Sequence, residues 1–82
     1  MKKVIRFTAS WCQPCKIMTT MLEEIKPSLP FEVVDIDVHP EIAMDFGIRS
    51  VPTLVMMDEL VEMKRTTGIK TKEQLTDWFK DA

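Results

Sequence analysis

The hydrophobic pattern of the chain changes its period at residues 9–12, and this change constrains the fold more than any other feature. Before it, "KKVIRFTA" (residues 2–9) is rich in β-branched and aromatic residues, which indicates a strand. After it, five apolar residues predict one face of a helix that ends at Pro27: Ile17, Met18, Met21, Leu22 and Ile25. A strand that leads directly into a helix predicts the first half of a parallel β-α-β unit with a right-handed crossover.

The middle of the chain supplies more strands and a short helix. "FEVVDIDV" (31–38) is typical of a strand in which Val34, Ile36 and Val38 share one face. Pro40 can begin a short helix that Gly47 ends. "TLVMM" (53–57) and "LVEMKRT" (60–66) are two further strands, whose connection is too short for a crossover, so they must form a hairpin. The clear alternation of the last strand is typical of a sheet edge.

A final helix is predicted by its start signal. Thr71 and Gln74 have the spacing of a capping box, and Leu75, Trp78 and Phe79 follow on one helical face as core residues. The predicted order is therefore β-α-β-α-β-β-α. We expect one α/β domain over residues 1–82, in which three helices flank a four-stranded mixed sheet.

Composition and charge narrow the possible functions. The formal net charge is -2 and 29% of the residues are charged, with no strongly basic stripe, so nucleic acid is not an expected partner. No window reaches the roughly 18 apolar residues of a membrane span, and the apolar run after the first lysines is too short for a secretory signal. We therefore expect a cytoplasmic monomer.

Both cysteines of the chain stand three positions apart in "ASWCQPCK" (9–16). A disulfide between Cys12 and Cys15 would restrain the unfolded chain very little, so a structural staple is a poor explanation. A structural zinc needs four ligands, whereas the chain offers two cysteines and His39, and we expect no metal. A metal shared across a dimer and two buried small side chains stay open as weaker alternatives to a redox pair.

The position of the pair favours redox chemistry. Cys12 comes where the first strand leads into the helix, and the free N–H groups of a helix start stabilise a thiolate. Lys16 adds a positive charge one turn later, and Pro14 suits a first turn because no N–H partner is needed there. We expect an exposed Cys12 to attack and a shielded Cys15 to resolve.

Three segments together resemble the thioredoxin family. They are "WCQPC", "DIDVHPEIAMDFGIRSVPT" and "TTGIKTKEQL", and the resemblance runs from about Val4 to the C-terminus. It implies a minimal thioredoxin fold that begins at the central strand of the family and lacks its usual N-terminal strand and helix. The length is closer to that of a glutaredoxin.

The resemblance also implies a substrate groove around the cysteines. It implies that Pro52 is preceded by a cis peptide bond and lies against the disulfide, and that Trp11 is a partly exposed ring beside it. Val51 would offer its backbone to an extended substrate segment. The implied groove residues are Trp11, Ser50, Val51, Pro52, Thr67, Gly68 and Ile69.

The resemblance further implies reduction of protein disulfides by dithiol–disulfide exchange through Cys12 and Cys15. The chain carries no nucleotide motif such as G-x-G-x-x-G, so we expect no bound cofactor. Electrons would come from a partner, either an NADPH-dependent thioredoxin reductase or a donor of the glutathione and glutaredoxin type. Ribonucleotide reductase is a substrate that the family suggests.

Three residues near the cysteines depart from the family pattern. Gln13 replaces the usual glycine, at a position that tunes the potential. Arg6 replaces a buried acid that assists proton transfer, and an arginine cannot shuttle a proton. It either reaches solvent or pairs with a carboxylate such as Asp35, or it supports the Cys12 thiolate electrostatically. Val33 replaces a lysine of the family near the same place.

Two competing functions remain at this point. "SVP" resembles a glutaredoxin segment, which suggests a reductase recycled by glutathione, although Trp11 and Pro14 follow the thioredoxin pattern. The other alternative is an interaction module with the same fold and idle cysteines.

Overall fold

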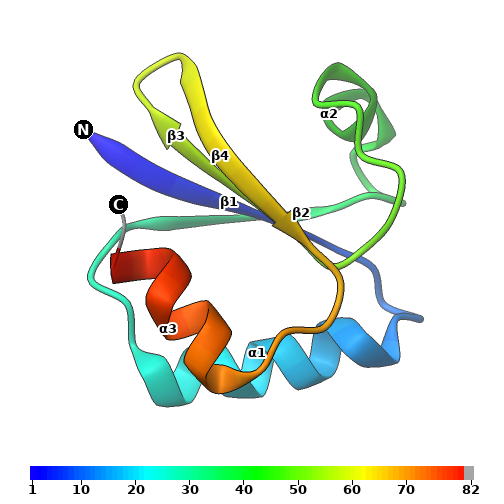
Figure 1. The fold of residues 1–82 in the computed structure, drawn as a ribbon. Helices are drawn as coiled ribbons and strands as arrows, with labels where there is room; N and C mark the ends of the chain where they lie inside the picture. The colour runs from blue at the N-terminus through cyan, green and yellow to red at the C-terminus, as the bar shows by residue number, and fades with distance from the viewer. Residues whose placement is uncertain (81–82) are drawn as a thin grey trace.

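The computed structural model describes residues 1–80 and contains seven elements in the predicted order (Figure 1). The strands and helices are β1 (Lys2–Thr8), α1 (Gln13–Ile25), β2 (Phe31–Asp35), α2 (Pro40–Asp45), β3 (Thr53–Asp58), β4 (Val61–Thr67) and α3 (Lys72–Lys80). Within these residues no helix is long and apolar enough to cross a membrane.

The four strands form one mixed sheet in the order β2-β1-β3-β4. β1 and β2 are parallel, as the predicted crossover requires, while β1 pairs with β3 and β3 with β4 in antiparallel fashion. β4 is an edge strand, as its alternating pattern predicts. The predicted α/β class with a four-stranded mixed sheet and three helices is confirmed.

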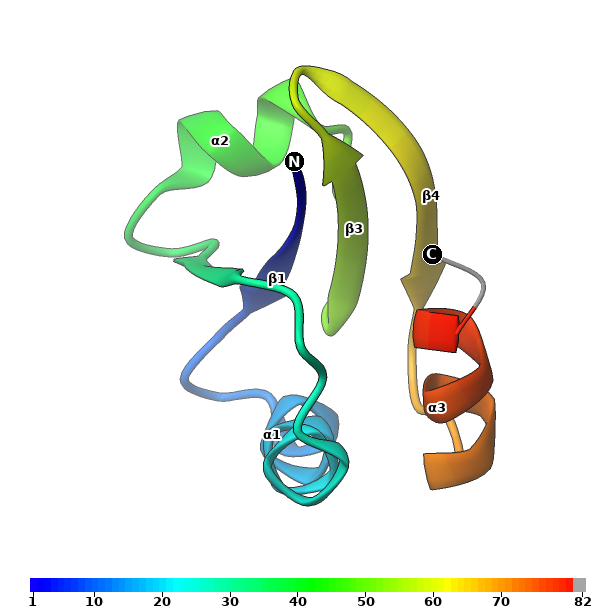
Figure 2. The ribbon, with the colours of Figure 1, turned by 90° about the vertical axis from the view of Figure 1, so that its left-hand side faces the viewer.

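Helices cover both faces of the sheet, with α1 and α3 on one face and α2 on the other (Figures 1 and 2). Alternate residues of β1 divide between the two resulting cores, because successive side chains of a strand point to opposite faces. Val4 packs with Met18 of α1 and Leu75 of α3, whereas Phe7 packs with Ala43 of α2. The cysteine pair lies at the end of β1, where the chain leaves the sheet for α1.

The second strand is shorter than its sequence pattern predicts. It ends at Asp35 instead of continuing to Val38, whose side chain is 66% exposed and not on a buried face. The Asp35 carboxylate accepts the N–H groups of Asp37 at 2.8 Å and Val38 at 3.4 Å. This side chain therefore turns the backbone out of the sheet, because it offers those N–H groups an alternative to a strand partner.

The helices follow their predicted start and stop signals closely. At the start of α3 the Thr71 hydroxyl accepts the backbone N–H of Gln74 at 3.0 Å, and the side-chain Oε1 of Gln74 accepts the backbone N–H of Thr71 at 2.9 Å, which confirms the capping box. Trp78 and Phe79 pack against the core as predicted. The prediction that Ile17 belongs to the buried face of α1 is wrong. Its side chain is 46% exposed, and the buried face begins at Met18.

Candidate active site

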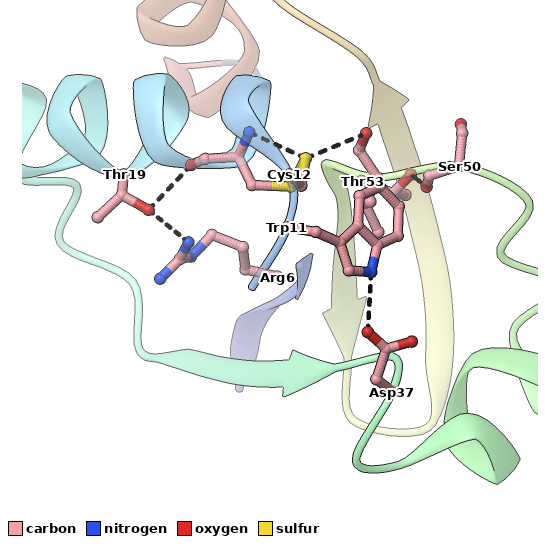
Figure 3. Close-up of a disulfide and its surroundings, with 9 residues drawn as sticks. Arg6, Trp11, Cys12, Thr19, Asp37, Ser50 and Thr53 are labelled. Carbon is pink, nitrogen blue, oxygen red and sulfur yellow. Dashed lines mark hydrogen bonds between the residues drawn. A yellow bond between two sulfur atoms is a disulfide. The ribbon is translucent and has the colours of Figure 1, made fainter. Parts of the chain in front are cut away.

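Cys12 is the N-cap of α1, so the two cysteines lie in and just before the first turn of the helix (Figure 3). They form a disulfide with the Cα atoms 5.2 Å apart. The Cys12 sulfur also accepts the Cys15 N–H at 3.1 Å. Pro14 occupies the first turn, where an N–H would have no helical partner, and helps to fix this geometry. The helix start thus holds both sulfurs and supplies one of them with a hydrogen-bond donor.

The expected difference in exposure between the two cysteines is wrong. Cys12 is 3% exposed and Cys15 is 2% exposed. Both pack against Ala9, with Ile36 and Val51 beside them, so the disulfide is enclosed by the loops around it. What separates the two sulfurs in this oxidised state is hydrogen bonding, because the Cys15 N–H is directed at Cys12.

The loop before β3 lies against the disulfide. The Val51–Pro52 peptide bond is cis. The Val51 carbonyl oxygen lies 3.7 Å from the Cys12 sulfur. The Pro52 carbonyl accepts the Gly68 N–H at 2.9 Å. The Ser50 carbonyl accepts the Thr53 hydroxyl at 2.8 Å. These bonds hold the loop in place from both sides and connect it to the end of β4.

The residues after β4 form a neighbouring wall. The Thr67 hydroxyl lies 3.3 Å from that of Thr53. Gly68 has a φ of +84°, in the left-handed region that glycine adopts most readily. Ile69 follows with 59% of its surface exposed. The structure therefore brings the loop at Pro52 and the segment from Thr67 to Ile69 together, while a substrate groove along them stays a prediction.

The Trp11 side chain is 66% exposed beside the disulfide. Its indole N–H donates to the Asp37 carboxylate at 2.8 Å (Figure 3). Sequence reasoning did not single out Asp37, although the turn that Asp35 makes after β2 is what brings it to the ring. Gln13 and Lys16 are also exposed in the first turn of α1.

Arg6 is connected to the cysteine pair from the other side. Its Nη1 donates to the Thr19 hydroxyl at 2.7 Å, and that hydroxyl donates to the Cys15 carbonyl at 3.0 Å (Figure 3). Pairing of Arg6 with Asp35 is wrong, because Asp35 is engaged in its own turn and the guanidinium lies against α1. Thr19 was missed; its only signal is its place four residues after Cys15, where a threonine can bond the preceding turn.

Burial is the main influence on the Arg6 guanidinium and lowers its pKa, while the nearby Glu23 carboxylate raises it. A group that titrates so far above neutral pH stays charged despite this shift. Within residues 1–80 no three His, Cys, Asp or Glu side chains gather as a metal site would require.

Comparison with known proteins places this geometry among described families. Residues 1–81 match the family model described as Thioredoxin. The thioredoxin of Chlamydia muridarum (strain MoPn / Nigg) is 39% identical over 75 residues, which cover 88% of this chain and 74% of the relative. The thioredoxin of Rickettsia felis is 34% identical over 80 residues, which cover 93% of this chain and 76% of the relative.

Solved structures give the same result. Mitochondrial thioredoxin 3 from Saccharomyces cerevisiae, in its oxidised form, has a TM-score of 0.85 at 32% identity, with 99% of this chain and 78% of that chain covered. Thioredoxin-2 of the malaria parasite shares the fold, with a TM-score of 0.89 at 22% identity over 100% of this chain and 84% of that chain.

Proposed function

The chain belongs to the thioredoxin family and is a thiol-disulfide oxidoreductase with Cys12 and Cys15 as its redox pair; from this premise we propose that it reduces disulfides in other proteins as a monomer. The observation that carries the proposal is the Cys12–Cys15 disulfide at the start of α1, against the loop at Val51. Because loops surround the redox pair, a partner protein would have to bring its disulfide to the Cys12 and Cys15 sulfurs along these loops.

The reaction is an exchange of disulfides in two steps. In the reduced protein the Cys12 thiolate attacks one sulfur of the substrate disulfide, and the other substrate sulfur leaves and takes a proton. Cys15 then attacks Cys12, which forms the Cys12–Cys15 bond and releases the second substrate thiol. Two electrons pass to the substrate in total. The Cys15 N–H supports the attacking role of Cys12, since it stabilises negative charge on that sulfur.

We assign substrate binding to the groove formed by Trp11, Ser50, Val51, Pro52, Thr67, Gly68 and Ile69. The exposed side chains of Trp11 and Ile69 would offer apolar contact to a bound segment. An extended substrate segment would pair with the backbone at Val51 and gain main-chain hydrogen bonds there, as an added strand does. Recognition through the main chain depends little on the side chains of the substrate, so one groove could bind several protein substrates.

A donor must return two electrons to the oxidised pair. We propose an NADPH-dependent reductase of the thioredoxin type as that donor, with the Trp11 and Pro14 pattern as support against glutathione. The reduced form would then be maintained in the cytoplasm, where thiols are kept reduced.

An insulin-reduction assay tests the function and the donor together. With dithiothreitol as the reductant, the protein is expected to accelerate the reduction of insulin disulfides. With NADPH and a thioredoxin reductase, the oxidised protein is expected to be reduced much faster than with glutathione. Faster reduction by glutathione would contradict the proposed donor. Failure to accelerate insulin reduction under every reductant would contradict the function itself.

A further inference from the structure

The Arg6 side chain lies behind the cysteine pair, between β1 and α1. Two hydrogen bonds, from Arg6 to Thr19 and from Thr19 to the Cys15 carbonyl, connect its guanidinium to the backbone of a catalytic cysteine (Figure 3). The contact joins a strand to a helix and holds the charge on the inner side of the first turns of α1. This arrangement gives the arginine a fixed position relative to the disulfide.

No ion pair within residues 1–80 neutralises this charge. Glu23 lies near Arg6, in a hollow that both residues line, but its side chain is exposed and does not hydrogen-bond the guanidinium. A positive charge that is partly removed from water and lacks a bonded carboxylate acts over a longer distance than a surface charge, because solvent and salt screen it less.

The surroundings of Arg6 are largely apolar. Arg6 lines a hollow of about 290 Å³ between α1 and β2. The other residues that line this hollow are the apolar Leu22, Pro27, Phe31 and Val33, together with Thr19 and the charged Glu23 and Lys26. Among the lining residues that the structure describes, only Thr19 hydrogen-bonds the guanidinium, through its hydroxyl at 2.7 Å. The bond to Thr19 therefore determines where the charge is held.

We propose that Arg6, held by Thr19, is a positioning residue that stabilises the thiolate of the reduced cysteine pair and so makes the couple more oxidising. This inference rests on the proposed function and concerns the regulation of the same site. When the disulfide is reduced it takes up two electrons, Cys15 takes one proton from solvent, and Cys12 stays a thiolate. A nearby positive charge favours that thiolate, and a stabilised reduced form raises the potential.

Replacing Arg6 by methionine tests the inference, since it removes the charge and keeps an unbranched side chain. The thiolate absorbance of the reduced protein, followed against pH, is expected to give a higher Cys12 pKa in Arg6→Met than in the wild type. The equilibrium with glutathione is expected to shift toward the protein disulfide by about threefold to tenfold, the upper value corresponding to about 30 mV for a two-electron couple. Arg6→Lys is expected to retain most of the wild-type pKa and equilibrium.

A matched control and a second variant keep the test decisive. Lys26→Gln removes a charge of the same sign at the exposed end of the same hollow, and is expected to change the Cys12 pKa less than Arg6→Met. Thr19→Val keeps the charge of Arg6 but removes the hydroxyl that holds the guanidinium. It is expected to raise the Cys12 pKa, as Arg6→Met does, but by a smaller amount. It also serves if Arg6→Met does not fold.

Clear results would overturn the inference. An unchanged Cys12 pKa and glutathione equilibrium in Arg6→Met would remove the role of Arg6, and the same values in Thr19→Val as in the wild type would remove that of Thr19. Equal shifts in Arg6→Lys and Arg6→Met would contradict an effect of charge. These measurements use glutathione and no protein substrate, so their failure is distinct from failure to reduce insulin.

Discussion

Cys12 and Cys15 differ in their bonds far more than in their burial. The Cys12 sulfur is approached by the Cys15 N–H and by the Val51 carbonyl, whereas the backbone of Cys15 is held by Thr19. In the proposed mechanism, a substrate disulfide at the Val51 loop would therefore meet Cys12 first. The second cysteine is needed only after a mixed disulfide has formed, which makes the two roles separable by substitution.

Replacing Cys15 by serine is expected to stop the reaction after its first step. The mixed disulfide between Cys12 and the substrate should accumulate, because no thiol is left to resolve it. Incubation with an excess of a disulfide-containing peptide, followed by mass spectrometry, should show one peptide bound through residue 12. Turnover at the wild-type rate without a bound peptide would contradict the assignment of attack to Cys12 and resolution to Cys15.

At the scale of single residues, the sequence identified the groups that react but not the groups that hold them. The cysteine spacing and the helix start favoured a redox pair, and the resemblance to the thioredoxin family added the support that identified it. Thr19 and Asp37 act by contacting a side chain from another element, and such contacts depend on the phase of a helix and the path of a turn. Spacing along one element does not give which of its residues will face a particular side chain of another element.

At the scale of elements, one arginine ties β4 to the end of α2. The Arg65 guanidinium makes two hydrogen bonds to Glu62, at 2.7 and 2.6 Å, and also donates to the Phe46 carbonyl at 2.9 Å. Hydrogen bonding to Arg65 lowers the pKa of Glu62 below its ordinary value of 4.5. The edge strand is thereby joined to the helix that covers the same face of the sheet.

The Glu62–Arg65 pair predicts a small dependence of stability on pH. The pKa of Glu62 is lower in the folded protein than in the unfolded chain. The stabilisation that Glu62 gives to the folded state is therefore fully present well above the unfolded-state pKa, and it is lost as the pH falls through the folded-state pKa. Urea unfolding is expected to show Glu62→Gln less stable than the wild type at neutral pH by less than about 1 kcal/mol, since the pair is near the surface. The difference should disappear in strong acid.

Glu24→Gln is a matched control for this pair, because the Glu24 carboxylate lies 3.9 Å from the Lys72 ammonium group, a longer ion pair. It is expected to change the free energy of unfolding less than Glu62→Gln at neutral pH. An equal loss in both variants, or a Glu62→Gln difference that persists in acid, would contradict a specific bond to Arg65.

The end of β2 shows why an element can be predicted while its boundary is not. The alternation of apolar residues continues past Asp35 to Val38, so periodicity alone extends the strand. The structure ends it at Asp35 because one carboxylate accepts two backbone N–H groups. A side chain that competes for the backbone overrides the hydrophobic pattern at that point.

At the scale of the whole molecule, the two cores on the faces of the sheet are small, so single contacts matter. The core beneath α1 and α3 consists of Val4, Met18, Leu54, Met56 and Leu75, with partly buried side chains packed around it. Leu75 is the only residue of α3, as the structure describes it, that is fully buried. The attachment of the last helix to the sheet therefore depends strongly on one side chain.

Replacing Leu75 by alanine is expected to lower the free energy of unfolding by about 2–5 kcal/mol, through lost burial and the cavity left behind. Leu60→Ala deletes the same atoms at the tip of the β3–β4 hairpin, where Leu60 is 95% exposed. That control is expected to stay within about 0.5 kcal/mol of the wild type. Similar losses in the two variants, measured by urea unfolding, would contradict the docking of α3 through Leu75.

The capping role of Cys12 has a consequence for anyone who prepares an inactive form of this protein as a bait for its partners. Serine is among the preferred residues at an N-cap, and its oxygen can accept the Cys15 N–H that the sulfur now accepts. Alanine leaves that N–H without a partner at the start of α1. A serine bait thus separates the loss of sulfur chemistry from damage to the helix, whereas an alanine bait confounds the two.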